Sequence, residues 1–135
     1  MPEPDTASPI EYMGGPKAPP QAPPVIAVCK DLFFVARIRE TARLANVPLR
    51  LTRTTDELIA ALTEAPRLIL VDLTGGFDYE AMFSALGEKR PPVLAFTTHA
   101  LAKHTQPWHA RCDRVVTKET LTAELPEFLV NGIAS

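Results

Sequence analysis

Leu68-Ile69-Leu70-Val71-Asp72 is the most apolar stretch of the chain, and the turn Leu73-Thr74-Gly75-Gly76 follows it directly. Four apolar residues that end in a carboxylate are typical of a strand covered by helices on both faces. Such strands occur in parallel sheets, where functional groups gather beyond the carboxyl ends of the strands. We therefore expect a central strand here, with Asp72 at a functional edge of the sheet.

Patterns of strand and helix alternate on both sides of this stretch. Short apolar or alternating runs predict four further strands, at residues 25–29, 49–52, 93–97 and 113–117. The segments between them show apolar residues at helical spacing. Five strands that alternate with helices predict an α/β fold, with one parallel five-stranded sheet and helices on both faces.

Most of the expected helices have clear start signals. A side chain that can cap a helix N-terminus precedes three of them: Asp31, Thr54 and Asp78. The pattern over residues 98–111 is weak, and Pro107 interrupts any long helix there. A last helix is predicted over residues 123–130, with Thr122 as its N-cap.

The N-terminal segment has a different composition. Residues 1–24 hold eight of the 14 prolines and show neither helical nor strand periodicity. This composition predicts a Pro-rich disordered tail or linker at 1–24 and a single folded domain at 25–135.

The bulk properties exclude several classes of protein. With 135 residues, of which 46% are hydrophobic, the chain suits one globular domain. A net charge of −2 gives no basis for nucleic-acid binding. There is no apolar run of membrane-spanning length, no secretory signal and no disulfide framework, since the chain has only two cysteines. These features predict a cytoplasmic protein that binds neither nucleic acid nor membrane.

The parallel-sheet rule selects the candidate site before any family is considered. The residues at or just after the expected strand ends are Cys29, Lys30, Asp31, Asp72, Thr97 and Lys118. Their order and spacing resemble the receiver domain of two-component response regulators, over about residues 25–133. The resemblance implies a sheet of order 2-1-3-4-5. It also implies that Asp72 is the phosphoacceptor, Thr97 the switch hydroxyl and Lys118 the cation that contacts the phosphoryl group.

In that family a carboxylate attacks a phosphoryl group, and a magnesium ion and the lysine neutralise the charge. This sequence departs from the pattern at the acidic pair, where Cys29 and Lys30 stand and only Asp31 is acidic. A lysine at this position weakens magnesium binding, and Lys30 or Lys118 can instead form an ion pair with Asp72. The departures imply an atypical receiver, or pseudo-receiver, with no cofactor and weak magnesium binding at most.

The three histidines raise a metal-site alternative. His99, His104 and His109 are separated by five residues each, so neither neighbouring pair shares a helical face. No motif typical of a zinc site is present. We therefore predict exposed loop histidines and no metal site.

The sequence favours a bacterial-type signalling module that binds a protein partner, such as a signalling protein or a kinase, and that is not an enzyme. Two alternatives stay open. One is a working receiver in a phosphorelay, with Asp72 as phosphoacceptor; the other is a small α/β enzyme that uses the same edge of the sheet. A homodimer through the fourth helix, the fifth strand and the last helix is a further expectation.

Overall fold

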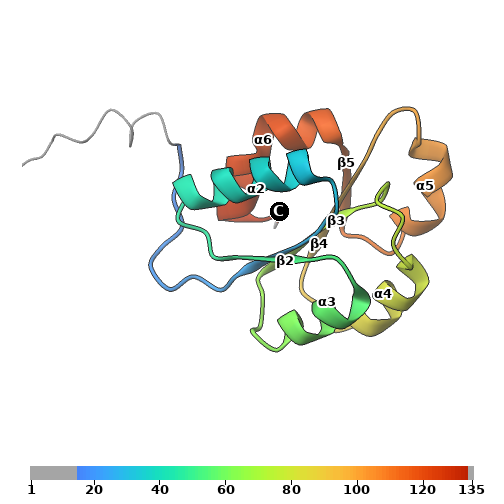
Figure 1. Cartoon of the computed structure of the whole chain (residues 1–135), viewed down its shortest axis with the longest axis horizontal. Helices are drawn as coiled ribbons and strands as arrows, with labels where there is room; N and C mark the ends of the chain where they lie inside the picture. Colours follow the sequence, from blue (N-terminus) through green and yellow to red (C-terminus); the bar gives the residue numbers. More distant parts are fainter. Residues whose placement is uncertain (1–14, 134–135) are drawn as a thin grey trace, which may run out of the picture.

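The computed structural model describes residues 15–133, which form one parallel five-stranded sheet of order β2-β1-β3-β4-β5 (Figure 1). Every neighbouring pair of strands is parallel. The strands are β1 (Val25–Val28), β2 (Leu49–Thr52), β3 (Leu68–Asp72), β4 (Val93–Thr97) and β5 (Arg114–Thr117). The predicted sheet and its order are confirmed.

Helices cover both faces of the sheet, as predicted. In Figure 1, α2 (Leu32–Leu44) and α6 (Lys118–Asn131) lie on one side of the strands, and α3 (Thr55–Leu62) and α4 (Tyr79–Leu86) lie on the other. The remaining helix, α5 (Ala102–His109), lies beside α4, because the Trp108 ring stacks on Phe83 with 6.0 Å between centroids.

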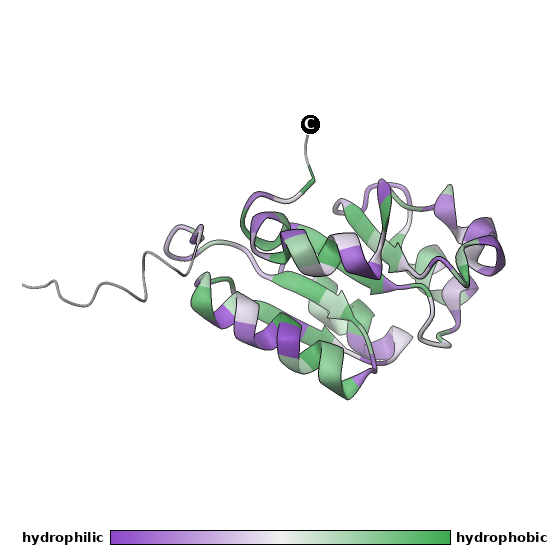
Figure 2. Cartoon of the chain, turned by 90° about the horizontal axis from the view of Figure 1, so that it is seen from above, coloured by the Kyte–Doolittle hydropathy of each residue, from purple (hydrophilic) through white to green (hydrophobic). Residues whose placement is uncertain are grey.

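Alternate residues of the strands build two separate hydrophobic clusters. Val25 and Ala27 of β1 pack under α2 and α6, whereas Ile26 and Val28 pack under α3 and α4. This follows from the two-residue period of a strand, and it explains why β1 and the first four residues of β3 are all apolar. Figure 2 shows the result: the strands are mostly green, and the helices carry both colours.

Two helices differ from the sequence-based expectation. The helix α5 forms despite Pro107, which lies inside it. His104 and His109 are therefore on a short helix and not in the predicted loop. The last helix begins at Lys118, five residues before the predicted start, and Thr117 caps it in place of Thr122. The helix is kinked at Glu124, close to the predicted start. Pro126 accounts for the kink, because it cannot donate a backbone hydrogen bond into the preceding turn.

Part of the predicted disordered tail is instead packed on the domain. Ala18 is buried, and its N–H donates to the carbonyl of Ala45 at 2.7 Å. Lys17 Nζ donates to the carbonyl of Leu44, the last residue of α2, at 2.8 Å. Residues 1–14 of the predicted tail lie outside the described residues. Among residues 15–133, the helices are too short or too polar to cross a membrane.

Candidate functional site

Asp72 ends β3 at the edge of the sheet where the carboxyl ends of the strands meet. Asp72 is only 5% exposed. Val28 pairs with Val71 in the parallel register, so the next residue along, Cys29, is level with Asp72. The thiol of Cys29 donates to Asp72 Oδ2 over 3.8 Å. The position predicted for a phosphoacceptor therefore faces a neutral thiol, where the family pattern has a carboxylate.

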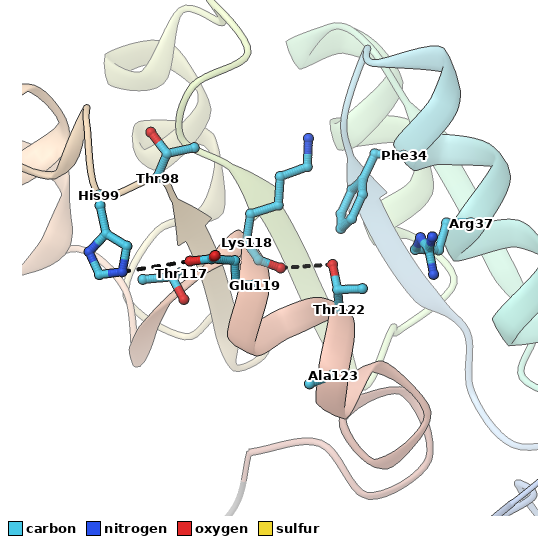
Figure 3. A pocket seen from close by; sticks show the side chains of 9 residues that line it. All are labelled: Phe34, Arg37, Thr98, His99, Thr117, Lys118, Glu119, Thr122 and Ala123. Atoms are coloured by element: carbon cyan, nitrogen blue, oxygen red, sulfur yellow. Dashed lines mark hydrogen bonds and ion pairs between the residues drawn. The ribbon is translucent and has the colours of Figure 1, made fainter.

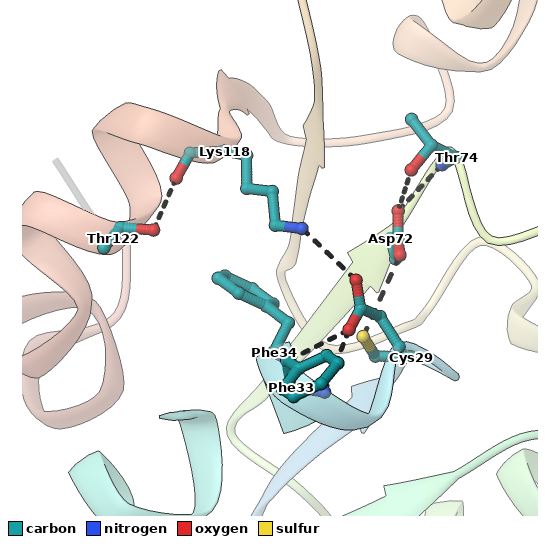
Figure 4. A network of polar contacts seen from close by, with 8 residues as sticks. Cys29, Phe33, Phe34, Asp72, Thr74, Lys118 and Thr122 are labelled. Atoms are coloured by element: carbon teal, nitrogen blue, oxygen red, sulfur yellow. Dashed lines mark hydrogen bonds and ion pairs between the residues drawn. The ribbon is translucent and has the colours of Figure 1, made fainter. Parts of the chain in front are cut away.

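The second carboxylate oxygen of Asp72 is held by the loop that follows. Oδ1 accepts hydrogen bonds from the backbone N–H of Thr74 at 2.8 Å and from its hydroxyl at 2.7 Å (Figure 4). The Tyr79 hydroxyl donates to the backbone carbonyl of Asp72 at 2.6 Å and accepts from the N–H of Gly75 at 3.0 Å. Burial raises the pKa of Tyr79 above its ordinary value. Thr74 thus fixes the Asp72 carboxylate, and Tyr79 fixes the backbone of the loop.

Lys30 does not contact Asp72, contrary to the predicted ion pair. Its ammonium lies 4.4 Å above the centroid of the Phe77 ring. That ring packs tightly on Gly75, since a Cβ atom there would lie 2.6 Å from the ring. Attraction between the cation and the ring favours this position of the charge, over the loop that follows Asp72.

Lys118 does not contact Asp72 either. Its Nζ lies 3.5 Å from Asp31 Oδ2 and 4.7 Å from the centroid of the Phe34 ring (Figure 4). The early start of α6 explains the difference, because Lys118 is the first helical residue and its side chain leaves that turn toward α2. Among residues 15–133, no Lys, Arg or His nitrogen lies within 4.0 Å of the Asp72 carboxylate.

Asp31 is the N-cap of α2, as predicted. Its Oδ1 accepts from the backbone N–H groups of Phe33 at 3.0 Å and Phe34 at 3.1 Å. The hydrogen bond from Phe34 is the main reason that the pKa of Asp31 is lowered, and the charge of Lys118 adds to the effect. The Asp31 carboxylate therefore caps α2 with one oxygen and forms an ion pair with Lys118 through the other.

Thr97 is bound to a helix and not to Asp72. Its Oγ1 accepts from Thr105 Oγ1 of α5 at 3.0 Å, and both residues are buried. Thr105 Oγ1 also lies 2.8 Å from His109 Nε2. This short polar chain ties the end of β4 to α5. His99, the third histidine, instead lies 3.7 Å from Glu119, where both side chains are exposed.

Both cysteines are free thiols, Cys29 buried and Cys112 half-buried. Burial raises the pKa of Cys29 to about 11, against the opposing effect of the Asp31 backbone N–H, and the charge of Asp72 adds to the rise. Burial likewise raises the pKa of Cys112 to about 11. A thiol with such a pKa is protonated at neutral pH and is a poor nucleophile.

The residues around Asp72 do not fit the magnesium ion that the family resemblance implies. Magnesium requires several hard oxygen ligands in octahedral geometry. Cys29 is a neutral thiol, Lys30 is a cation, and Asp31 is shared between the helix cap and Lys118. Within residues 15–133 no three His, Cys, Asp or Glu side chains are grouped as metal ligands would be.

The sequence reasoning missed an exposed apolar surface beside this site. Leu32 is 69% exposed and Phe33 is 91% exposed at the start of α2. Next to them, a cleft of about 600 Å³ opens between α2 and α6 (Figure 3). The helical spacing of α2 carried the signal. Its buried residues are Phe34, Val35, Ile38 and Ala42, and Leu32 and Phe33 lie outside this buried set.

Comparison with known proteins bears on the fold. No family model matches the chain, and no curated protein matches it. A solved structure does match: the crystal structure of response regulator RPA3017, from red light signalling in R. palustris. The TM-score is 0.60 at 17% identity, and the match covers 82% of this chain and 96% of that one. The chain has the response-regulator receiver fold. The fold predicted from the strand-end residues is thereby confirmed.

Proposed function

We propose that this chain is a signalling module of the receiver type, which binds a protein partner and is not phosphorylated in the usual magnesium-dependent way. One observation carries the proposal: the Asp72 carboxylate is buried, bonded to Thr74, and has no cation within 4.0 Å among residues 15–133. Phosphoryl transfer depends on positioning and on neutralisation of charge on the phosphoryl oxygens. A receiver without a full set of magnesium ligands, and with Lys30 and Lys118 engaged by Phe77 and Asp31, has weaker neutralisation of that charge.

The exposed residues of α2 supply a surface for a partner. Phe33 and Leu32 are adjacent large apolar side chains, and large exposed apolar groups surrounded by polar residues favour an interface. Arg37, one turn after Phe33, adds a positive charge. The proposal includes a cytoplasmic location. A homodimer through α5, β5 and α6 stays a prediction.

Treatment with acetyl phosphate and magnesium tests the phosphorylation part of the proposal. We expect the intact mass of the chain to stay unchanged, while a phosphorylatable receiver treated in parallel is modified. A stoichiometric gain of about 80 Da, the mass of one phosphoryl group, that is abolished by Asp72→Asn would contradict the proposal. That outcome would favour the working phosphorelay receiver.

The interaction part needs a variant with a matched control. Phe33→Ser removes the most exposed large apolar side chain of residues 15–133, and Ile59→Ser removes another exposed one, on α3. We expect Phe33→Ser to abolish capture of a partner from the source cell and Ile59→Ser to preserve it. Equal capture by both variants would remove α2 as the binding surface.

A further inference from the structure

The cleft between α2 and α6 combines an apolar floor with a charged rim. The Phe34 ring from α2 and Ala123 from α6 line it, and Arg37 and Lys118 lie at its edges (Figure 3). The ammonium of Lys118 lies over the Phe34 ring, so one cation is already placed next to the apolar surface. Such a lining suits a segment that carries both a carboxylate and a large apolar side chain.

The charges of the cleft are not balanced by its own residues. Arg37 forms no ion pair with any residue in the range 15–133. Lys118 forms an ion pair only with Asp31 among residues 15–133, and that carboxylate also caps α2. Among the described residues, Glu119 is the single acidic one that lines the cleft, and it lies 3.7 Å from His99. A positive charge therefore remains beside Phe34.

The chain itself contains a segment of complementary chemistry. Residues 1–14 include three acidic residues and no lysine or arginine. Within them, Ile10-Glu11-Tyr12-Met13 places three large apolar side chains around one carboxylate. This composition matches the apolar floor and the positive rim of the cleft.

The place where the described chain begins is within reach of the cleft. Lys17 is bonded to Leu44, at the C-terminal end of α2. From Leu44 the helix rises about 10 Å back to Arg37 and about 15 Å back to Phe34, at 1.5 Å for each residue. The five residues from Tyr12 to Lys17 span up to about 17 Å when extended. The linking length is therefore sufficient without any change in the domain.

We propose that residues 10–13 of this chain bind in the cleft between α2 and α6, with the Glu11 carboxylate paired to the Arg37 guanidinium and Tyr12 against Phe34. This contact does not depend on the proposed function.

Fluorine NMR on the full chain tests the contact directly. The chain has two tyrosines, Tyr12 and Tyr79, so 3-fluorotyrosine labelling yields two resonances that Tyr79→Phe assigns. We expect the Tyr12 resonance to show a smaller solvent isotope shift, between H₂O and D₂O, than free fluorotyrosine does. Arg37→Glu is expected to restore the shift of free fluorotyrosine.

The controls separate the possible outcomes. Arg39→Glu reverses an exposed charge on the same helix but away from the cleft, and it is expected to leave Tyr12 unchanged. The Tyr79 resonance reports folding in each variant, and Glu11→Arg combined with Arg37→Glu is expected to restore protection. A solvent-exposed Tyr12 in the unmodified chain, or one insensitive to Arg37→Glu, would overturn the proposal. Protection that disappears on dilution would also overturn it, in favour of a segment from a second copy.

Discussion

The ammonium of Lys118 lies 3.5 Å from the carboxylate of Asp31, and this pair stands in place of the predicted pair between Lys118 and Asp72. The consequence is electrostatic. The positive charge that the family pattern brings to the phosphoacceptor is held at the start of α2, and Asp72 is bonded to a thiol and to its own loop.

The two roles of Asp31 can be separated by substitution. Asp31→Asn keeps a side-chain oxygen that can cap α2 but removes the charge that pairs with Lys118. Asp31→Ala removes both. We expect the urea midpoint of unfolding to stay near the wild-type value for Asp31→Asn and to fall clearly for Asp31→Ala, because an exposed ion pair contributes little. Equal losses for the two variants would show that the charge, and not the cap, is what matters.

Restoring a carboxylate at position 29 should create magnesium dependence. In Cys29→Asp, a second carboxylate would stand where the thiol now lies 3.8 Å from Asp72 Oδ2. Without metal the buried unpaired charge should cost on the order of 3 kcal/mol of stability. Thermal unfolding in EDTA and in magnesium measures this, and magnesium should restore much of the loss. Cys29→Asn is the uncharged control and should not respond. A magnesium response of the wild type as large as that of the variant would contradict the poor fit of the site.

The hydrogen bond between Thr97 and Thr105 should be visible in a double-mutant cycle. Both hydroxyls are buried, 3.0 Å apart. Thr105→Val leaves the Thr97 hydroxyl without this partner and should cost about 1–2 kcal/mol in the free energy of unfolding. Thr97→Val combined with Thr105→Val should cost less than the sum of the two single changes. Additive losses would mean that the two hydroxyls do not stabilise each other.

The buried thiol of Cys29 should make stability fall in alkaline solution. Its pKa is about 11 in the folded chain, against an ordinary value of 9.0. The unfolded chain therefore loses this proton first, so the contribution is complete below pH 9.0 and is lost as the pH rises through about 11. The loss should be on the order of 2 kcal/mol. Unfolding curves at neutral pH and across that window measure it, with Cys29→Ala as the comparison. Cys112 titrates in the same window, so the variant should show a reduced pH dependence and not a flat one.

The accuracy of the sequence-based predictions varied with the kind of signal. The strand at Leu68–Asp72 has the predicted bounds, because a run of apolar residues between a proline and a glycine turn has few other solutions. The predicted start of the last helix was wrong by five residues, since α6 begins at Lys118. Pro126 and the cap-like Thr122 suggested a late start, but the structure has one helix with a kink at Glu124. Local start signals did not distinguish a kink from a beginning.

The alternation of strands and helices in the sequence predicted the parallel sheet, and the resemblance to receiver domains implied its order. Because the carboxyl ends of parallel strands meet at one edge, the sequence also placed Cys29, Asp72 and Thr97 together. Only the tertiary structure decided which charges meet there. Lysine side chains are long, and their direction depends on the helix turn and the aromatic ring beside them. Lys30 lies over Phe77 and Lys118 lies against Asp31, and neither choice is encoded in the spacing of residues along the chain.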